Sequence, residues 1–212
     1  MFLTHLFEAL DKKHAAFCFG RMNPPTVGHK QLIDTVSESA QGGDYFIFAS
    51  QTQDKKKNPL NWSQKVNYLT KLFPEHAAHI VKDPEVKTIM DAIHWLYAHG
   101  YREVTLVAGS DRLPSFQELL PKYNGVEGTN GAYYKFDKIN FASSGERDPD
   151  ADGVAGVSAS GAREAAKAGD FASFQQNIGT KDTKLAQNLY NDVRSGMNIV
   201  DEATIGSRLD FN

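Results

Sequence analysis

A loop rich in glycine, proline and hydrogen-bond donors follows the first apolar run of the sequence. The run covers residues 15–19, and residues 20–29 continue as Gly-Arg-Met-Asn-Pro-Pro-Thr-Val-Gly-His. The two prolines exclude a strand or helix interior here, and the glycines allow the backbone to approach a ligand closely. A helix that begins near Val27 would direct its free N–H groups and its positive dipole end toward this loop. Thr26 and His29 can then donate hydrogen bonds to one anion, which predicts a phosphate site.

A second group of donors lies late in the chain, in the segment Val157-Ser158-Ala159-Ser160-Gly161-Ala162-Arg163. Two hydroxyls at a helix start, with an arginine one turn later, can hold terminal phosphates and neutralise a pyrophosphate leaving group. The simpler interpretation has Ser158 as an ordinary N-cap and Arg163 on a solvated helix face. The simpler interpretation of His29 is that its side chain faces solvent or is hydrogen-bonded in the core. The occurrence of both segments in this order, roughly 130 residues apart, favours the phosphate site.

Together these segments resemble the signatures of the nucleotidylyltransferase superfamily, which contains adenylyltransferases and cytidylyltransferases. The pattern Gly-Arg-x-x-Pro-x-x-x-Gly-His is closest to the archaeal-type nicotinamide mononucleotide (NMN) adenylyltransferases, and the late segment resembles their Ile-Ser-x-Thr-x-x-Arg motif. The family's first motif ends in His-x-Gly-His, where Thr26 replaces the first histidine. Thr-x-Gly-His is the variant of the pantetheine-phosphate adenylyltransferases. The resemblance runs from Phe17 to about Asp170.

This resemblance implies transfer of AMP from ATP to a phosphorylated acceptor, with release of pyrophosphate and with Mg²⁺ accompanying the nucleotide. The best-matching acceptor is NMN, which would give NAD. Pantetheine phosphate, FMN or a sugar phosphate stay open as acceptors, as does CTP in place of ATP. The residues expected to be catalytic are His29, Thr26 and Arg163. Those expected to bind the nucleotide are Gly20, Arg21, Met22, Gly28, Ser158 and Ser160. Those expected to bind the second substrate are Gly109, Asp111, Lys57 and Trp62.

The residues expected to bind the second substrate rest on two weaker similarities. Gly109-Ser110-Asp111 resembles the family's Gly-x-Asp, which contacts a ribose or the second substrate; the alternative is Asp111 as a helix N-cap. Lys57-Asn58-Pro59-Leu60, followed by Lys65, resembles the Asn-Pro-Phe segment of the archaeal enzymes. A run of lysines is more often a solvated loop than a phosphate clamp. Trp62 would either pack in the core or stack on a base.

Apolar runs alternate with amphipathic segments along most of the chain. We expect strands at residues 15–19, 44–50, 80–81, 103–108 and 133–142, and helices at 27–40, 62–73, 86–99 and from 158 to about 195. This rhythm predicts an α/β fold: a Rossmann-like parallel sheet with helices on both faces and a helical C-terminal appendage. We expect residues 1–170 to form the nucleotidylyltransferase domain, with a lead-in helix at 1–14, and residues 171–212 to form a helical extension and a tail.

The composition excludes several classes of protein. With 23 basic and 26 acidic residues among 212, the net charge of −3 argues against a nucleic-acid partner. No apolar run approaches the roughly 20 residues that a membrane helix needs, so no membrane partner is expected. Cys18 is the single cysteine; it cannot form an internal disulfide, which suits a cytoplasmic protein, and within its strand it should be buried and inert.

Metal-binding motifs are not recognisable in the sequence. It has no His-Glu-x-x-His pair and no cysteine pair, so a zinc site is not expected. It also has no P-loop motif. Asp148–Gly153 matches the opening of an EF-hand loop, but the twelfth position, which should be glutamate, is Ala159. We therefore expect an acidic loop there, with at most weak Mg²⁺ or Ca²⁺ binding.

Two functions from other classes stay open. One is a nucleotide-binding module that binds ATP and transfers nothing. The other is a packaged phage structural protein of weak activity, because Leu6-Phe7-Glu8-Ala9 resembles the head-targeting leaders of tailed-phage internal proteins. Such a protein would lie in the host cytoplasm or in the virion. Helical C-terminal regions in the family cover the second substrate or make subunit contacts, so a homo-oligomer is also open.

Overall fold

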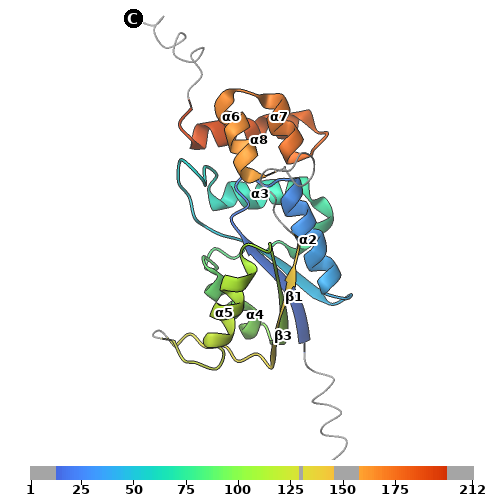
Figure 1. The fold of residues 1–212 in the computed structure, drawn as a ribbon, viewed down its shortest axis with the longest axis vertical. Coiled ribbons are helices and arrows are strands. Elements are labelled where there is room, and N and C mark those ends of the chain that lie inside the picture. The colour runs from blue at the N-terminus through green and yellow to red at the C-terminus, as the bar shows by residue number, and fades with distance from the viewer. Residues whose placement is uncertain (1–12, 129–130, 146–157, 200–212) are drawn as a thin grey trace, which may run out of the picture. The chain divides into compact units, whose positions relative to one another are not determined.

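The computed structural model describes residues 13–128, 131–145 and 158–199 (Figure 1). Contacts between Cα atoms divide these residues into two compact units, which interleave along the chain. We call residues 13–20, 30–50, 75–128 and 131–145 the sheet unit, and residues 21–29, 51–74 and 158–199 the helical unit. A separate extension that begins at residue 171 stays a prediction.

Four parallel strands form the centre of the sheet unit. They are β1 (Lys13–Gly20), β2 (Asp44–Ala49), β3 (Tyr101–Ala108) and β4 (Lys138–Ser143), in the spatial order β2-β1-β3-β4. Phe17 on β1 pairs with Phe46 of β2 and with Leu106 of β3. Strand β3 also pairs with β4, and all three strand pairings are parallel. Parallel strands require crossover connections, which the helices between them supply. This sheet confirms the expected α/β class.

Helices account for most of the remaining described residues. They are α2 (Val27–Ser39), α3 (Trp62–Leu72), the 3₁₀ helix η1 (Pro74–His79), α4 (Ile89–Ala98), α5 (Leu113–Lys122), α6 (Ala159–Ala168), α7 (Phe171–Ile178) and α8 (Thr183–Gly196). The last three are the expected helical C-terminal appendage. Within the described ranges, no helix has both the length and the apolar character needed to cross a lipid bilayer.

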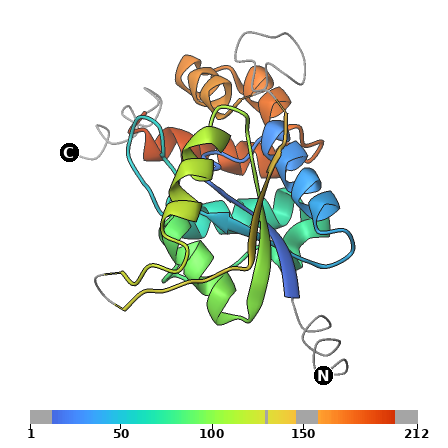
Figure 2. The same cartoon turned by 60° about the horizontal axis from the view of Figure 1, so that its bottom comes forward.

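The sheet is covered by helices on both faces. Phe17 and Leu106 point to one face, where they form an apolar core with side chains of α4 and α5 such as Ile93. Cys18 and Ile47 are as deeply buried but point to the opposite face, because side chains alternate along a strand. Helix α2 lies on that opposite face (Figure 2). Burial raises the pKa of the Cys18 thiol to about 12, so this cysteine is buried and unreactive, as expected.

The helical unit has an apolar core of its own. Side chains of α3, α6, α7 and α8 form it, together with Leu60, which lies two residues before α3. Its fully buried members include Leu60, Ala162, Phe174 and Leu189. The Tyr68 hydroxyl on α3 donates a 2.6 Å hydrogen bond to Asp192 on α8. Helices α3 and α8 are therefore joined by both apolar and polar contacts.

Three expected elements differ from the structure. Lys13 and His14 belong to β1, so the lead-in helix does not reach residue 14; its remainder lies outside the described residues, as do the acidic loop at 148–153 and the tail after residue 199. The strand at 80–81 is only a bridge from Ile80 to Ile47. The strand at 133–142 begins at Lys138, because Phe136 is bonded through its backbone to the Asn124 side chain instead of to a strand.

Candidate phosphate-binding site

The loop after β1 is fixed by the side chain of Asn23. Gly20 ends β1, Arg21 is exposed, and Met22 is buried with a backbone φ of 44°. Asn23 is 1% exposed; its Nδ2 donates to the Leu60 carbonyl at 2.8 Å, and its Oδ1 accepts the Leu60 N–H at 3.0 Å. The amide thus bonds to both the N–H and the carbonyl of Leu60, as the backbone of a neighbouring β-strand would. Asn23 therefore ties this loop to the segment just before α3.

Thr26 and His29 form a buried pair at the N-terminus of α2. The Thr26 backbone N–H donates to His29 Nδ1 at 3.1 Å, and Thr26 Oγ1 lies 2.9 Å from the same nitrogen. Because a backbone N–H can only donate, Nδ1 must be the acceptor, and a neutral ring then carries its proton on Nε2. His29 is 6% exposed and Thr26 1%. In a neutral His29 the donor nitrogen is therefore Nε2.

Ser158 caps the N-terminus of α6. Its Oγ accepts the Gly161 N–H at 2.9 Å, which is the N-cap role that the simpler interpretation gave it. A hydroxyl that accepts one hydrogen bond still has its own proton to donate, so capping and phosphate binding are compatible. Ser160 lies exposed in the first turn of the same helix.

Arg163 joins the late motif to the early one. Its Nη1 donates to the Asn23 carbonyl at 2.8 Å, across 140 residues of sequence, and its Nη2 donates to Ser160 Oγ at 3.1 Å. Arg163 is half-buried, so the interpretation that it lies on a solvated helix face is wrong. Neither α2 nor α6 has an acidic residue in its first turn. Two helix N-termini, a guanidinium and an imidazole N–H in one compact unit are suited to an anion with several charges.

Lys65 is a further candidate in the helical unit, in addition to the site residues expected from the sequence. It is fully buried on α3, and burial lowers its pKa from 10.5 to about 8. Lysine is among the residues that proteins bury least, so a fully buried lysine in this unit is unusual. The sequence signal for it was its position after Asn58 and Pro59, which was too weak alone to select one lysine from the basic residues nearby.

Lys57 and Trp62 lie at either end of the segment that leads into α3. Lys57 is exposed, and its backbone N–H donates to Asp54 Oδ1 at 2.7 Å, in a tight turn closed by a further bond from Asn58 to the same carboxylate. Trp62 is the first residue of α3 and is half-buried. The roles of both in binding the second substrate stay predictions.

Gly109 and Asp111 lie in the sheet unit, directly after β3. A Cβ at Gly109 would come within 2.8 Å of Asp111 Oδ1, so the glycine allows the carboxylate to fold back over the chain. The residue that precedes α5 as its N-cap is Arg112, which makes no side-chain capping bond. Asp111 is therefore not the helix N-cap that the alternative interpretation proposed, and its contact with a substrate stays a prediction.

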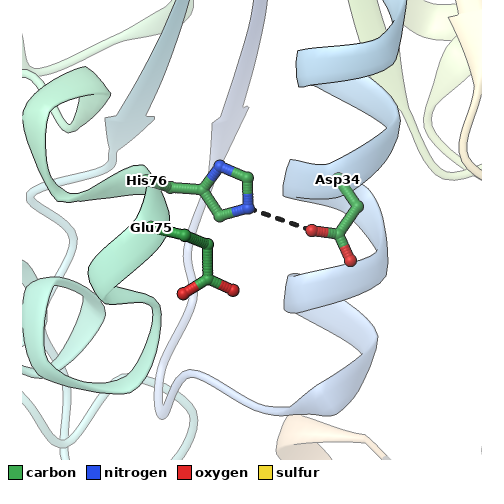
Figure 3. A group of neighbouring side chains, drawn as sticks. All are labelled: Asp34, Glu75 and His76. Carbon is green, nitrogen blue, oxygen red and sulfur yellow. Dashed lines mark hydrogen bonds and ion pairs between the residues drawn. The ribbon is translucent and has the colours of Figure 1, made fainter.

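One group of metal-ligand residue types lies in the sheet unit, away from any sequence motif. Figure 3 shows Asp34 on α2 facing His76 and Glu75 on η1, with potential ligand atoms within 4.8 Å of one another. The Lys30 ammonium lies 2.9 Å from both oxygens of Asp34 and 3.1 Å from Glu75. Tyr45 completes the group through a 2.9 Å bond to His76 Nδ1. The ammonium already occupies the position between the carboxylates, and we assign the group as an ion-pair network.

These charges shift one another's pKa values in the directions that such a network requires. Burial opposes ionisation of Asp34, but hydrogen bonds from Lys30 and His76 outweigh it and lower the pKa of this carboxyl. The Glu75 carboxylate accepts its own backbone N–H and a bond from Lys30, and its pKa is lowered as well. The hydrogen bond to Asp34 raises the pKa of Lys30. Near neutral pH all three groups are charged.

Comparison with known proteins shows similarity of fold. A scan of protein-family models finds no match, and no curated protein sequence matches the chain. Among solved structures, the chain is similar to nicotinic acid mononucleotide adenylyltransferase of Plasmodium falciparum complexed with NaAD, at 16% identity over 84% of this chain and 98% of that one, with a TM-score of 0.54. The same enzyme complexed with APC gives 16% identity, the same coverage and a TM-score of 0.53. The fold that the nucleotidylyltransferase resemblance implied is therefore confirmed.

Proposed function

We propose that this chain is a nucleotidylyltransferase that transfers AMP from ATP to a phosphorylated acceptor and releases pyrophosphate. The observation that carries the proposal is the hydrogen bond from Arg163 to the Asn23 carbonyl, which brings together two motifs from distant parts of the sequence. The shared fold supports it, because the Plasmodium falciparum structures are of an adenylyltransferase.

His29 and the N-terminus of α2 would act on the α-phosphate. An oxygen of the acceptor phosphate attacks the α-phosphorus of ATP, and the bond from that phosphorus to the bridging oxygen of pyrophosphate breaks. Negative charge develops on the α-phosphate oxygens and on the leaving group in the transition state. His29 Nε2–H would donate to an α-phosphate oxygen, and Thr26 fixes the tautomer that makes this possible. Such catalysis depends on positioned donors and needs no covalent intermediate.

Arg163 and the N-terminus of α6 would hold the β- and γ-phosphates. Arg163 carries a permanent positive charge, and Ser158 and Ser160 add hydroxyl donors in the first turn of the helix. In the two phosphate motifs, the guanidinium of Arg163, the His29 imidazole and the serine hydroxyls can all donate hydrogen bonds, which suits phosphate better than a metal ion. A Mg²⁺ ion would accordingly be held mainly by phosphate oxygens and water, and when bound it neutralises charge on the polyphosphate.

A pyridine mononucleotide is the acceptor we propose. The sequence motifs favour NMN, and the Plasmodium falciparum enzyme is named for nicotinic acid mononucleotide. These acceptors differ only in an amide or a carboxylate on the ring, so the reaction is the same for both. Gly109 and Asp111 are the proposed contacts to this second substrate, with Lys57 and Trp62.

Pyrophosphate release across a panel of acceptors tests the proposal. The full-length chain is supplied with ATP or CTP and Mg²⁺, and with NMN, nicotinic acid mononucleotide, pantetheine phosphate, FMN or a sugar phosphate. We expect turnover with ATP and a pyridine mononucleotide that His29→Ala abolishes and His99→Ala, at an exposed helix end, leaves unchanged. Thermal stabilisation by ATP without pyrophosphate from any acceptor would instead identify a nucleotide-binding module.

A further inference from the structure

The turn that ends α7 contacts the N-termini of both helices in the proposed phosphate site. Asn177 and Gly179 lie two residues apart in this turn, within the helical C-terminal region (Figure 1). Asn177 faces the start of α6, and Gly179 faces the start of α2. Neither residue belongs to the motifs at residues 20–29 and 157–163.

Asn177 determines the position of the first residues of the α6 cap. Its Nδ2 donates to the Ser173 carbonyl at 2.8 Å, which directs Oδ1 toward α6, where it accepts the Ser158 N–H at 3.2 Å. A Cβ at Gly161 would lie 3.0 Å from the same Oδ1, so the first turn of α6 packs directly against the amide. The amide thus sets where the remaining free N–H groups of this helix point.

Gly179 allows close approach of α7 to the start of α2. It is the C-cap of α7 with a φ of 75°, and a Cβ there would overlap Cγ2 of Val27, two residues before His29. Gly169 makes an informative comparison. It is the C-cap of α6 with a φ of 77°, but no atom lies within 4 Å of the position of its Cβ. Both glycines satisfy the backbone, and only Gly179 also makes room for the helix that carries His29.

We propose that Asn177 and Gly179 are positioning residues for the phosphate site: they brace the N-termini of α6 and α2 in the relative placement that a bound polyphosphate requires. This assigns a role to the helical C-terminal region, and it rests on the proposed function. Loss of either contact should weaken binding of the part of the nucleotide that spans the two helix ends, and it should spare a ligand that lacks the β- and γ-phosphates.

Asn177→Ala tests the contact to α6 by calorimetric binding of ATP, inorganic pyrophosphate and AMP. We expect the affinity for ATP and pyrophosphate to fall tenfold or more, with AMP binding changed less than twofold. Asn191→Ala, an exposed asparagine on α8, is the matched control and should bind all three as the wild type does. Equal weakening of all three ligands would show a merely structural role and overturn the proposal.

Gly179→Ala and Gly169→Ala form a matched pair for the contact to α2. Both introduce a Cβ at a positive φ, so both should lower the melting temperature through backbone strain. Only Gly179→Ala should weaken ATP binding and shift the imidazole nitrogen resonances of His29. Adding Val27→Ala to Gly179→Ala should restore both readouts, because the nearest remaining Val27 atom, Cβ, is 3.6 Å away. Equal effects of the two glycine variants, or no rescue, would contradict the proposal.

Binding of ATP and pyrophosphate by the wild-type chain distinguishes failure of the positioning role from failure of the proposed function. A wild type that binds neither ATP nor pyrophosphate would refute the proposed function and this inference with it. A wild type that binds both, with Asn177→Ala and Gly179→Ala unchanged, would refute the positioning role alone.

Discussion

His29 is held in a defined tautomer by two groups of one residue, and these two bonds can be separated by mutation. Thr26→Val removes the hydroxyl at 2.9 Å and keeps the backbone N–H bond at 3.1 Å. A neutral hydrogen bond contributes about 1 kcal/mol, so we expect kcat to fall about fivefold to tenfold with the tautomer preserved. Steady-state pyrophosphate release measures this, with Thr26→Ser as the control that keeps the hydroxyl. A variant Thr26→Val with full activity would show that the hydroxyl neither orients His29 nor contacts substrate.

Lys65 should make stability depend on pH in a way that no exposed lysine does. Its pKa is lowered to about 8 in the folded protein, so between about pH 8 and pH 10.5 the unfolded state binds more protons than the folded state. The free energy of unfolding should therefore rise with pH through this window relative to Lys65→Met. Denaturant unfolding at several pH values measures the difference, and Lys71→Met, at an exposed position of the same helix, is the control. Parallel pH profiles for wild type and Lys65→Met would contradict the shifted pKa.

Helix α2 is linked to η1 by charge, and acid should break this link. The pKa values of Asp34 and Glu75 are lowered on folding, so their contribution to stability is present above the unfolded pKa of about 4 and is lost as pH falls through the folded values. Because both carboxylates are more than 40% exposed, solvent screening limits the effect, and Asp34→Asn should cost about 0.5–1 kcal/mol near pH 7.

Unfolding of Asp34→Asn and wild type at pH 7 and at pH 3 measures this loss. The difference between them should shrink at the lower pH, because the carboxylates of the wild type are then becoming protonated. Glu85→Gln is the matched control, since its ion pair with Lys87 is largely exposed. A difference that is equally large at both pH values would show that Asp34 stabilises the helix by packing instead of by charge.

At the level of elements, the sequence predicts buried strands well and their exact ends poorly. Apolar runs identified β1, β2 and β3, because a strand covered on both faces needs apolar residues at successive positions. The alternating run at 133–142 predicts a strand from its start, but the Tyr134 hydroxyl donates to the Leu120 carbonyl and the Phe136 backbone pairs with the Asn124 side chain. Those bonds depend on residues more than ten positions away in the sequence, which hydrophobic periodicity does not detect.

Across the whole molecule, the motifs were readable from sequence and the contacts that connect them were not. Thr26, His29 and Arg163 were selected by residue type and spacing, and the structure places all three in the helical unit. The pair of bonds between Asn23 and Leu60 and the bond from the Ser158 N–H to Asn177 Oδ1 join residues 37 and 19 positions apart. Each of these bonds is between a side chain and the backbone, and such bonds become predictable only when the packing of the helices is known.

A double-mutant cycle on pyrophosphate release tests whether the early and late motifs form one catalytic site, as we propose. The rate of pyrophosphate formation from ATP and the accepted mononucleotide is measured for wild type, His29→Ala, Arg163→Ala and the double variant. Groups that stabilise one transition state together are not additive in their effects on rate. We predict that each single change lowers kcat by about 100-fold or more, and that the double variant loses much less than the product of the two. Turnover close to wild type in either single variant would show that the residue changed is not part of the catalytic site.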